Sequence, residues 1–255
     1  MATSISSQYD AKPDSITEAE WQTRVDLAAS YRLVAHYGWD DTIFTHLSAR
    51  VPGNAEHFLI NPFGMLFGEI TASSLVKIDE EANIIGESEY GVNPAGFTIH
   101  SAVHMARPDV GAVMHLHTKN GLAVSAQAAG LLPLTQTAMF VTPRVTYHDF
   151  EGVALNHEER ERIVADLGEK DLMILRNHGT MAAGNTIQET FIMLYFLEKA
   201  CEAQVAAQGG GELHFPSEQA IATTAEQTKG IHMSGHKAWP ALLRMLDRQD
   251  DSYRY

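Results

Sequence analysis

The stretch Ala112-Val113-Met114-His115-Leu116-His117 places two histidines two residues apart in an apolar run. Side chains alternate between the faces of a β-strand, so both imidazoles are predicted to point to one side and to meet at a single metal ion. A third histidine, His178, follows a second apolar run and precedes a glycine. A histidine pair at this spacing is by itself more often structural, and the matching context of His178 favours the metal. We therefore predict that His115, His117 and His178 hold one divalent ion in an open catalytic site.

The composition favours one large α/β domain. The chain has 255 residues, is 45% hydrophobic and has no linker rich in Pro, Gly or Ser in its middle. The lone Cys201 excludes an intramolecular disulfide and argues against a cysteine zinc site. No apolar run reaches the roughly 18 residues of a membrane span, and residues 1–14 lack the pattern of a signal peptide. These three observations lead us to expect a cytoplasmic protein. A net charge of −14 argues against binding to nucleic acid or to a membrane, and we expect a small-molecule partner.

Hydrophobic periodicity and capping signals predict an alternation of helices and strands. We expect helices at 17–37, 93–106, 120–129, 156–167 and 186–206, and strands at 43–51, 57–60, 74–78, 110–117, 134–140, 145–147 and 171–175. Pro52-Gly53-Asn54 predicts a hairpin between the first two strands, which favours a mixed or antiparallel sheet. Gly209-Gly210-Gly211 separates a core domain at 1–208 from a helical tail at 209–255. We expect the tail to pack on the same domain or on a neighbouring subunit.

Several motifs of the chain occur together in one known family. Ala106-Arg107-Pro108-Asp109, the strand with His115 and His117, and Asn177-His178-Gly179 make the chain similar to the class II aldolase/adducin family over roughly residues 19–206. The resemblance implies a three-layer α/β/α sandwich around a mixed, mostly antiparallel central sheet. It also implies that the three histidines hold zinc or a similar divalent ion. Members of the family are typically homotetramers with the active site at a subunit interface, and the resemblance implies this assembly here.

The chain departs from the sugar-phosphate aldolases of that family where those enzymes transfer protons and bind phosphate. By the resemblance, Gly96 stands where they carry an acidic catalytic residue, and the two serines that grip phosphate are missing. Thr45 and His46 stand where a glycine-asparagine pair binds substrate, and Gln136 lies near the position of a tyrosine that donates a proton. A phosphosugar aldolase is therefore not expected.

These comparisons and the predicted loops supply the other candidate site residues. His46 ends a strand beside the expected pocket and is a candidate general acid/base, with a structural histidine as the alternative. Gln136 is the other catalytic candidate. Substrate binding is assigned to Thr45, Asn61, Gly64 and His100, although Asn61-Pro62 and Phe63-Gly64 equally form a simple turn.

The expected function is a divalent-metal-dependent lyase, of decarboxylase or aldolase type, that acts on a small hydroxylated aromatic or keto acid. The metal would stabilise the enolate that forms on C–C cleavage. Zinc is the first choice of ion, with manganese or iron as alternatives. Two other functions stay open. One is a non-haem Fe(II) oxygenase on the same fold, because a three-histidine site suits Fe(II). The other is a non-catalytic adducin-like binding module, against which the three intact histidines count.

Overall fold

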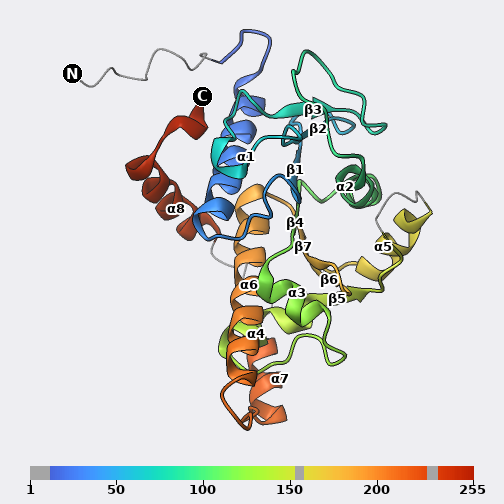
Figure 1. Cartoon of the computed structure of the whole chain (residues 1–255), viewed down its shortest axis with the longest axis vertical. Helices are drawn as coiled ribbons and strands as arrows, with labels where there is room; N and C mark the ends of the chain where they lie inside the picture. The colour runs from blue at the N-terminus through green and yellow to red at the C-terminus, as the bar shows by residue number, and fades with distance from the viewer. Residues whose placement is uncertain (1–11, 153–157, 229–234) are drawn as a thin grey trace.

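The computed structural model describes residues 12–152, 158–228 and 235–255, and within them one mixed sheet lies between two layers of helices (Figure 1). The strands are β1 (His46–Arg50), β2 (Phe58–Ile60), β3 (Val76–Ile78), β4 (Ala112–Leu116), β5 (Val145–His148), β6 (Leu172–Leu175) and β7 (Gly179–Gly184). Their order is β3-β2-β1-β4-β7-β6-β5, and each neighbouring pair is antiparallel except β5 and β6. The predicted mixed, mostly antiparallel sheet is confirmed.

Helices cover both sides of this sheet, which gives the three layers that the resemblance implied (Figure 1). One side carries α2 (Pro94–Ala106) and α5 (Glu159–Leu167). The other side carries α1 (Glu18–His36), α3 (Lys119–Ser125), α4 (Gln136–Val141), α6 (Ile187–Gln208), α7 (Glu218–Thr228) and α8 (Gly235–Gln249). Short 3-10 turns form at Phe67–Glu69, Thr142–Arg144 and Ser252–Arg254. None of the helices in the described ranges is long and apolar enough to cross a bilayer.

The strands contribute to hydrophobic cores on both sides of the sheet because their side chains alternate between the faces. The core on the α1 and α6 side includes Leu47, Met114, Leu116, Ile174 and Ala182. The core on the α2 and α5 side includes Val113, Met173, Leu175, Met181 and Ala183. Burial of each large aliphatic side chain contributes about 1.5–3 kcal/mol, so the alternation fixes which face of each strand points to which helices.

Threonine caps determine where several helices begin. The Oγ1 atoms of Thr17, Thr118, Thr135 and Thr186 each accept the backbone N–H three residues further on, at the start of α1, α3, α4 and α6. Each such cap satisfies one backbone donor that the first helical turn leaves unpaired. The helices predicted at 17–37 and 186–206 form at nearly these bounds, because their capping signals are present in the sequence.

The helix predicted at 120–129 is shorter, at Lys119–Ser125, and residues 156–157 of the helix predicted at 156–167 lie outside the described residues. Two further segments differ in kind from the sequence-based prediction. The strand predicted at 134–140 is wrong, because residues 136–141 form α4. This helix has six residues, too few for a 3.6-residue period to show in the sequence. The central strand β7 was not predicted, because Gly-Thr-Met-Ala-Ala-Gly consists mainly of small residues with little preference for strands. The strand forms nonetheless, because its backbone is hydrogen-bonded to β4 on one edge and to β6 on the other.

The C-terminal segment packs on the core of the same chain. In α8, the indole of Trp239 is 4% exposed, lies against Phe191 and donates a hydrogen bond of 3.1 Å to the Asp26 carboxylate in α1. Beyond α8, the carbonyl of Tyr253 accepts the N–H of Ala72 at 3.0 Å. Figure 1 shows α8 beside α1, next to the C-terminus. The tail thus covers α1 and α6 from outside.

Candidate metal centre

The three predicted metal ligands lie together at the ends of neighbouring strands. His115 is in β4, His117 directly follows it, and His178 lies in the turn between β6 and β7. Their ring centroids are 4.7 to 4.9 Å apart, and the Nε2 atoms of His115 and His117 are 3.0 Å apart. One ligand atom from each residue lies within 4.8 Å of the others. A single ion can therefore contact all three imidazoles.

Two of these imidazoles are held by a partner at Nδ1. The Nδ1 atom of His115 lies 2.9 Å from the carbonyl oxygen of Thr180, and that of His117 lies 3.1 Å from a carboxylate oxygen of Asp41. An Nδ1–H donated to an oxygen leaves Nε2 unprotonated, as a metal ligand must be. The Nε2 atoms of His115 and His117, which face each other, are therefore the atoms available to bind a metal ion. This donor set fits a divalent first-row ion.

Burial keeps two of the three ligand side chains, those of His115 and His178, neutral. Desolvation lowers the pKa of His115 well below its usual value, and the nearby His178 and His117 lower it further. Burial likewise lowers the pKa of His178 to about 4, with smaller contributions from His117 and His148. Neutral imidazole is the form that coordinates metal, so no proton has to be displaced from these two rings at neutral pH.

The residues on both sides of His178 have positive φ angles. Asn177 has a φ of 56° and Gly179 a φ of +153°, both in the region that L side chains rarely adopt. A Cβ at position 179 would lie 2.3 Å from the carbonyl oxygen of Leu116 and within 3.3 Å of ring carbons of His117 and His115. Glycine is therefore required where β7 passes the other ligands.

A cavity of about 490 Å³ opens in front of the three histidines. It is lined by Asp41, Phe44, Thr45, His46, Phe63, Asn93, Gly96, Ile99, His115, His117, Phe150, Gly152 and His178. Within the described ranges this lining contains three phenylalanine rings and no Lys or Arg. The volume suits a small molecule, and the described lining residues include no Lys or Arg side chain that could pair with a phosphate group.

His46 reaches the cavity because of the strand register. It lies directly opposite His115 in the antiparallel pairing of β1 with β4, and residues opposite each other share a face. The residue is 5% exposed, and neither ring nitrogen has a hydrogen-bond partner in the described part of the chain. Burial, with a smaller contribution from His117, lowers the pKa of His46 to about 3. An unpaired buried imidazole at a cavity wall is a group that a substrate can satisfy.

Gly96 explains how the His46 ring fits there. A Cβ at position 96 would lie 2.3 Å from Nδ1 of His46, closer than real Cβ atoms approach any neighbour. The imidazole thus fills the space in which a side chain at position 96 would begin. A side chain at position 96 and the His46 ring in its present position therefore exclude each other.

The other predicted substrate-binding residues are divided between the cavity and its surroundings. Thr45 lines the cavity, has a φ of 68°, and its hydroxyl has no partner among the described residues. Asn61 lies behind the wall, with its Oδ1 atom 2.9 Å from the Tyr31 hydroxyl. Gly64, with a φ of +120°, lies against Tyr90 and does not line the cavity. Of these residues, Thr45 alone can contact a molecule bound in the cavity as it stands.

His100 and Gln136 also lie outside the cavity lining. The Nδ1 atom of His100 is 2.7 Å from the Ser48 hydroxyl, which also lies 2.8 Å from Nε2 of His104, and the His100 ring meets His46 edge-on at 6.0 Å. Gln136 is an exposed residue at the start of α4, which packs against α6 and α7. Their assignment to the site stays a prediction, and for Gln136 it requires a neighbouring subunit.

Several site residues have no signal in the sequence. Asp41, Phe44, Phe63 and Phe150 reach the cavity from loops. Asp41 precedes β1 and contacts His117, 76 positions further along the chain. No spacing rule links such positions, so the contact is visible only once the sheet has formed.

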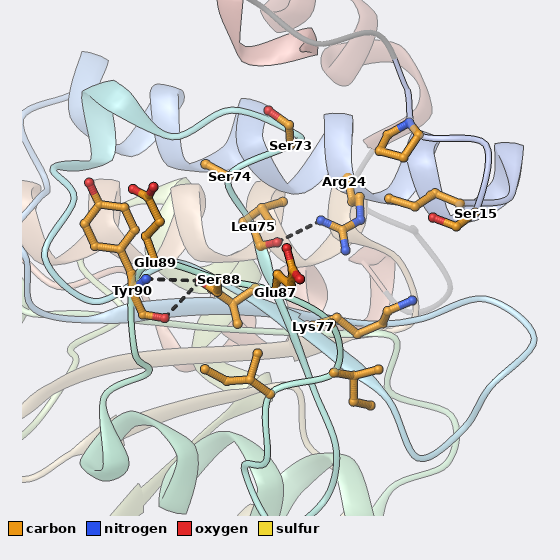
Figure 2. A pocket seen from close by; sticks show the side chains of 16 residues that line it. Ser15, Arg24, Ser73, Ser74, Leu75, Lys77, Glu87, Ser88, Glu89 and Tyr90 are labelled. Atoms are coloured by element: carbon orange, nitrogen blue, oxygen red, sulfur yellow. Dashed lines mark hydrogen bonds between the residues drawn. The ribbon is translucent and has the colours of Figure 1, made fainter.

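A larger cavity of about 920 Å³ lies elsewhere, between the loop at 84–90 and the start of β3 (Figure 2). Figure 2 shows the Arg24 guanidinium directed at the Leu75 carbonyl, 2.8 Å away. Arg24 also contacts Glu20, which pairs with Lys77 at 2.9 Å. Both cations at this cavity therefore have partners within the protein, and among the described residues it shares no lining residue with the histidine cavity.

Comparison with known proteins identifies the family. Residues 25–205 match the family described as Class II Aldolase and Adducin N-terminal domain, and the chain belongs to this family. A protein of Caulobacter vibrioides, whose name assigns it provisionally to aldolase class 2, is 58% identical over 241 residues, 93% of this chain and 94% of the relative. The family predicted from the motifs is confirmed.

Solved structures confirm the fold. The crystal structure of an aldolase II superfamily protein from Pseudomonas syringae is similar with a TM-score of 0.92 at 50% identity, over 95% of this chain and 98% of that one. A structure named L-fuculose 1-phosphate aldolase, from Glaciozyma antarctica, has a TM-score of 0.82 at 32% identity, over 96% of this chain and 97% of that one. The chain therefore has the class II aldolase architecture along nearly its whole length.

Proposed function

We propose that this protein is a divalent-metal-dependent lyase that cleaves a C–C bond in a small hydroxylated aromatic or keto acid. The observation that carries the proposal is the cluster of His115, His117 and His178, which faces a mostly apolar cavity of about 490 Å³. A divalent ion bound there supplies Lewis-acid stabilisation of the negative charge that develops as the bond breaks. We propose zinc as this ion, with manganese or iron as the alternatives.

The residues around the cluster have separate roles in this proposal. Thr180 and Asp41 orient the imidazoles of His115 and His117 through Nδ1. His46, which burial keeps neutral, offers an unprotonated ring nitrogen to a substrate proton, since both nitrogens lack partners within the described ranges and the residue lines the cavity. The rings of Phe44, Phe63 and Phe150 exclude water and offer flat apolar walls to a planar substrate.

A phosphosugar aldolase is the second candidate, because the Glaciozyma relative at 32% identity is named as one. The cavity favours the acid substrate over the sugar phosphate. Its described lining has no Lys or Arg, and position 96 has no carboxylate for proton transfer. A phosphate dianion would lose its hydration there without a Lys or Arg side chain among the described lining residues to pair with it.

We expect cleavage of L-fuculose 1-phosphate or L-rhamnulose 1-phosphate by the wild-type protein to be negligible. Gly96→Glu should restore it at most in part, because a side chain at position 96 displaces the His46 ring and the phosphate grip is still absent. The activity of metal-replete protein is measured with a coupled enzyme assay that detects the release of dihydroxyacetone phosphate. The double variant Gly96→Glu, His46→Asn is the matched control, since it removes the ring that the new side chain meets. Rapid turnover of either sugar phosphate by the wild type would overturn the choice of substrate class.

Metal analysis of protein purified without added metal separates the lyase from the two other functions. Zinc or manganese at one ion per chain supports the lyase. Ferrous iron together with O₂ uptake supports a non-haem oxygenase. Protein that binds no divalent ion even after reconstitution supports an adducin-like binding module.

We also propose a homotetramer whose subunits complete one another's sites. The support is the family membership, together with the exposed position of Gln136 away from the cavity of its own subunit. Dilution to monomers should abolish activity, while each subunit still binds metal through its three histidines. Light scattering after size exclusion, paired with activity across dilution, measures this. A fully active monomer of 28.0 kDa would refute the shared site.

A further inference from the structure

Glu198 is a buried acidic residue that the proposed chemistry does not use. It belongs to α6, on the side of the sheet opposite to α2, and is 2% exposed. One carboxyl oxygen lies 2.5 Å from the hydroxyl of Thr118, and the other accepts the hydroxyl hydrogen bond of Thr180. Burial raises the pKa of Glu198 to about 7, and the two hydroxyl groups oppose this rise. A carboxyl group placed so deep is costly, so its contacts call for an explanation.

The two threonines belong to the two chain segments that carry the histidines. Thr118 directly follows His117, and its hydroxyl also accepts the N–H of Gly121 at 2.9 Å. Thr180 is two residues beyond His178, and its carbonyl oxygen lies 2.9 Å from Nδ1 of His115. A single carboxyl group therefore ties the end of β4 to the start of β7 from behind the sheet.

The start of α3 is shaped to allow this arrangement. A Cβ at position 121 would lie 2.8 Å from Oγ1 of Thr118, 3.0 Å from Cγ2 of Thr180 and 3.4 Å from Oε1 of Glu198. Glycine is needed here because three groups meet at one point. The helix start, the two strand ends and α6 are thus packed around the Glu198 carboxyl.

We propose that Glu198 is a positioning residue that sets the distance between the segments carrying His115, His117 and His178. It does not contact the imidazoles, and it acts through the Thr118 hydroxyl and the Thr180 backbone. Metal sites need their ligands held to within roughly 0.5 Å, and residues outside the ligand set typically contribute about 10–100-fold to metal affinity. This inference rests on the proposed function of the three histidines as a metal site.

The test compares Zn²⁺ affinity in Glu198→Ala and Glu198→Gln by competition with a chelator. We expect Glu198→Ala to bind Zn²⁺ about 10–100-fold more weakly than the wild type. Glu198→Gln should stay within roughly threefold of the wild type, because its amide has the same shape and can accept from one threonine and donate to the other. If Glu198 contributed only its charge, Glu198→Gln would bind Zn²⁺ as weakly as Glu198→Ala.

Two controls on the same helix separate positioning from general loosening of α6. Cys201→Ala truncates a buried neighbour one turn away, and Glu202→Ala removes an exposed carboxylate that pairs with Lys199. Both should bind Zn²⁺ like the wild type, even where Cys201→Ala lowers the thermal midpoint. If Cys201→Ala weakens Zn²⁺ binding as much as Glu198→Ala, the positioning role is refuted.

A second variant keeps the test decisive if Glu198→Ala does not fold. Thr180→Val keeps the carbonyl that faces His115 and removes the hydroxyl that faces Glu198, so it should weaken Zn²⁺ binding in the same direction. Wild-type affinity in both folded Thr180→Val and folded Glu198→Ala would overturn this inference and leave the metal site standing. Failure of the wild type itself to bind Zn²⁺, Mn²⁺ or Fe²⁺ would instead overturn the proposed function.

Discussion

Replacing His117 with alanine should abolish stoichiometric binding of a divalent metal while the fold persists. The substitution removes one of three imidazole donors, and the Nε2 atom of His115 then loses the neighbour that lies 3.0 Å away. The affinity should fall by more than the roughly 100-fold that loss of an outer partner costs. The fold should survive because the His117 side chain is 24% exposed and belongs to none of the hydrophobic cores of the described residues.

Metal content per chain after gentle purification and reconstitution measures this effect, and circular dichroism checks the fold. His57→Ala is the matched control, because His57 contacts Asn54 in the turn between β1 and β2 and is remote from the cluster. It should retain full occupancy. Full occupancy in His117→Ala would show that the three histidines do not act as one metal site.

Replacing His46 with asparagine should lower turnover by roughly 10²–10⁴, the usual contribution of a general acid or base. Asparagine keeps a polar group at the cavity wall and does not exchange a proton near neutral pH. Metal content should be unchanged, because His46 lies beside the three ligands and is not one of them. The effect should appear in kcat more than in KM if His46 acts in the chemical step.

The measurement is steady-state turnover of the acid substrate that the wild-type protein cleaves, in variants loaded with equal metal. His57→Asn makes the same change at a turn away from the cavity and should leave both kinetic constants unaltered. Wild-type turnover in folded, metal-replete His46→Asn would assign His46 to structure alone.

The sheet and the proximity of the three histidines follow from local sequence rules. His115 and His117 share a side because a strand has a period of two, and Pro52-Gly53-Asn54 indicates the antiparallel pairing of β1 with β2. Long elements with a capping threonine, such as α1 and α6, were predicted nearly at their observed bounds. These features depend on residues that are close in sequence, which a pattern can show.

The surroundings of the cluster depend on tertiary placement. Glu198 contacts Thr118 across 80 positions, and Asp41 contacts His117 across 76. The sequence also does not show that the His46 ring lies where a side chain at position 96 would begin. It shows only a glycine at that position. Gln136 falls within the strand predicted at 134–140 and lies instead on a six-residue helix, because a short apolar run fits both structures.

The contact of the C-terminal segment with α1 has a consequence for the time at which the fold is completed. The Asp26 carboxylate is buried under Trp239, 213 positions later, and Arg32 meets Asp250 across 218 positions. At a synthesis rate of about 5–20 residues per second, Trp239 is added to the chain roughly 10–40 s after Asp26 of α1. During that interval the outer face of α1 is exposed. Pairings so distant in sequence also slow folding from the complete chain, so the docking of α8 is expected to be a late step in either case.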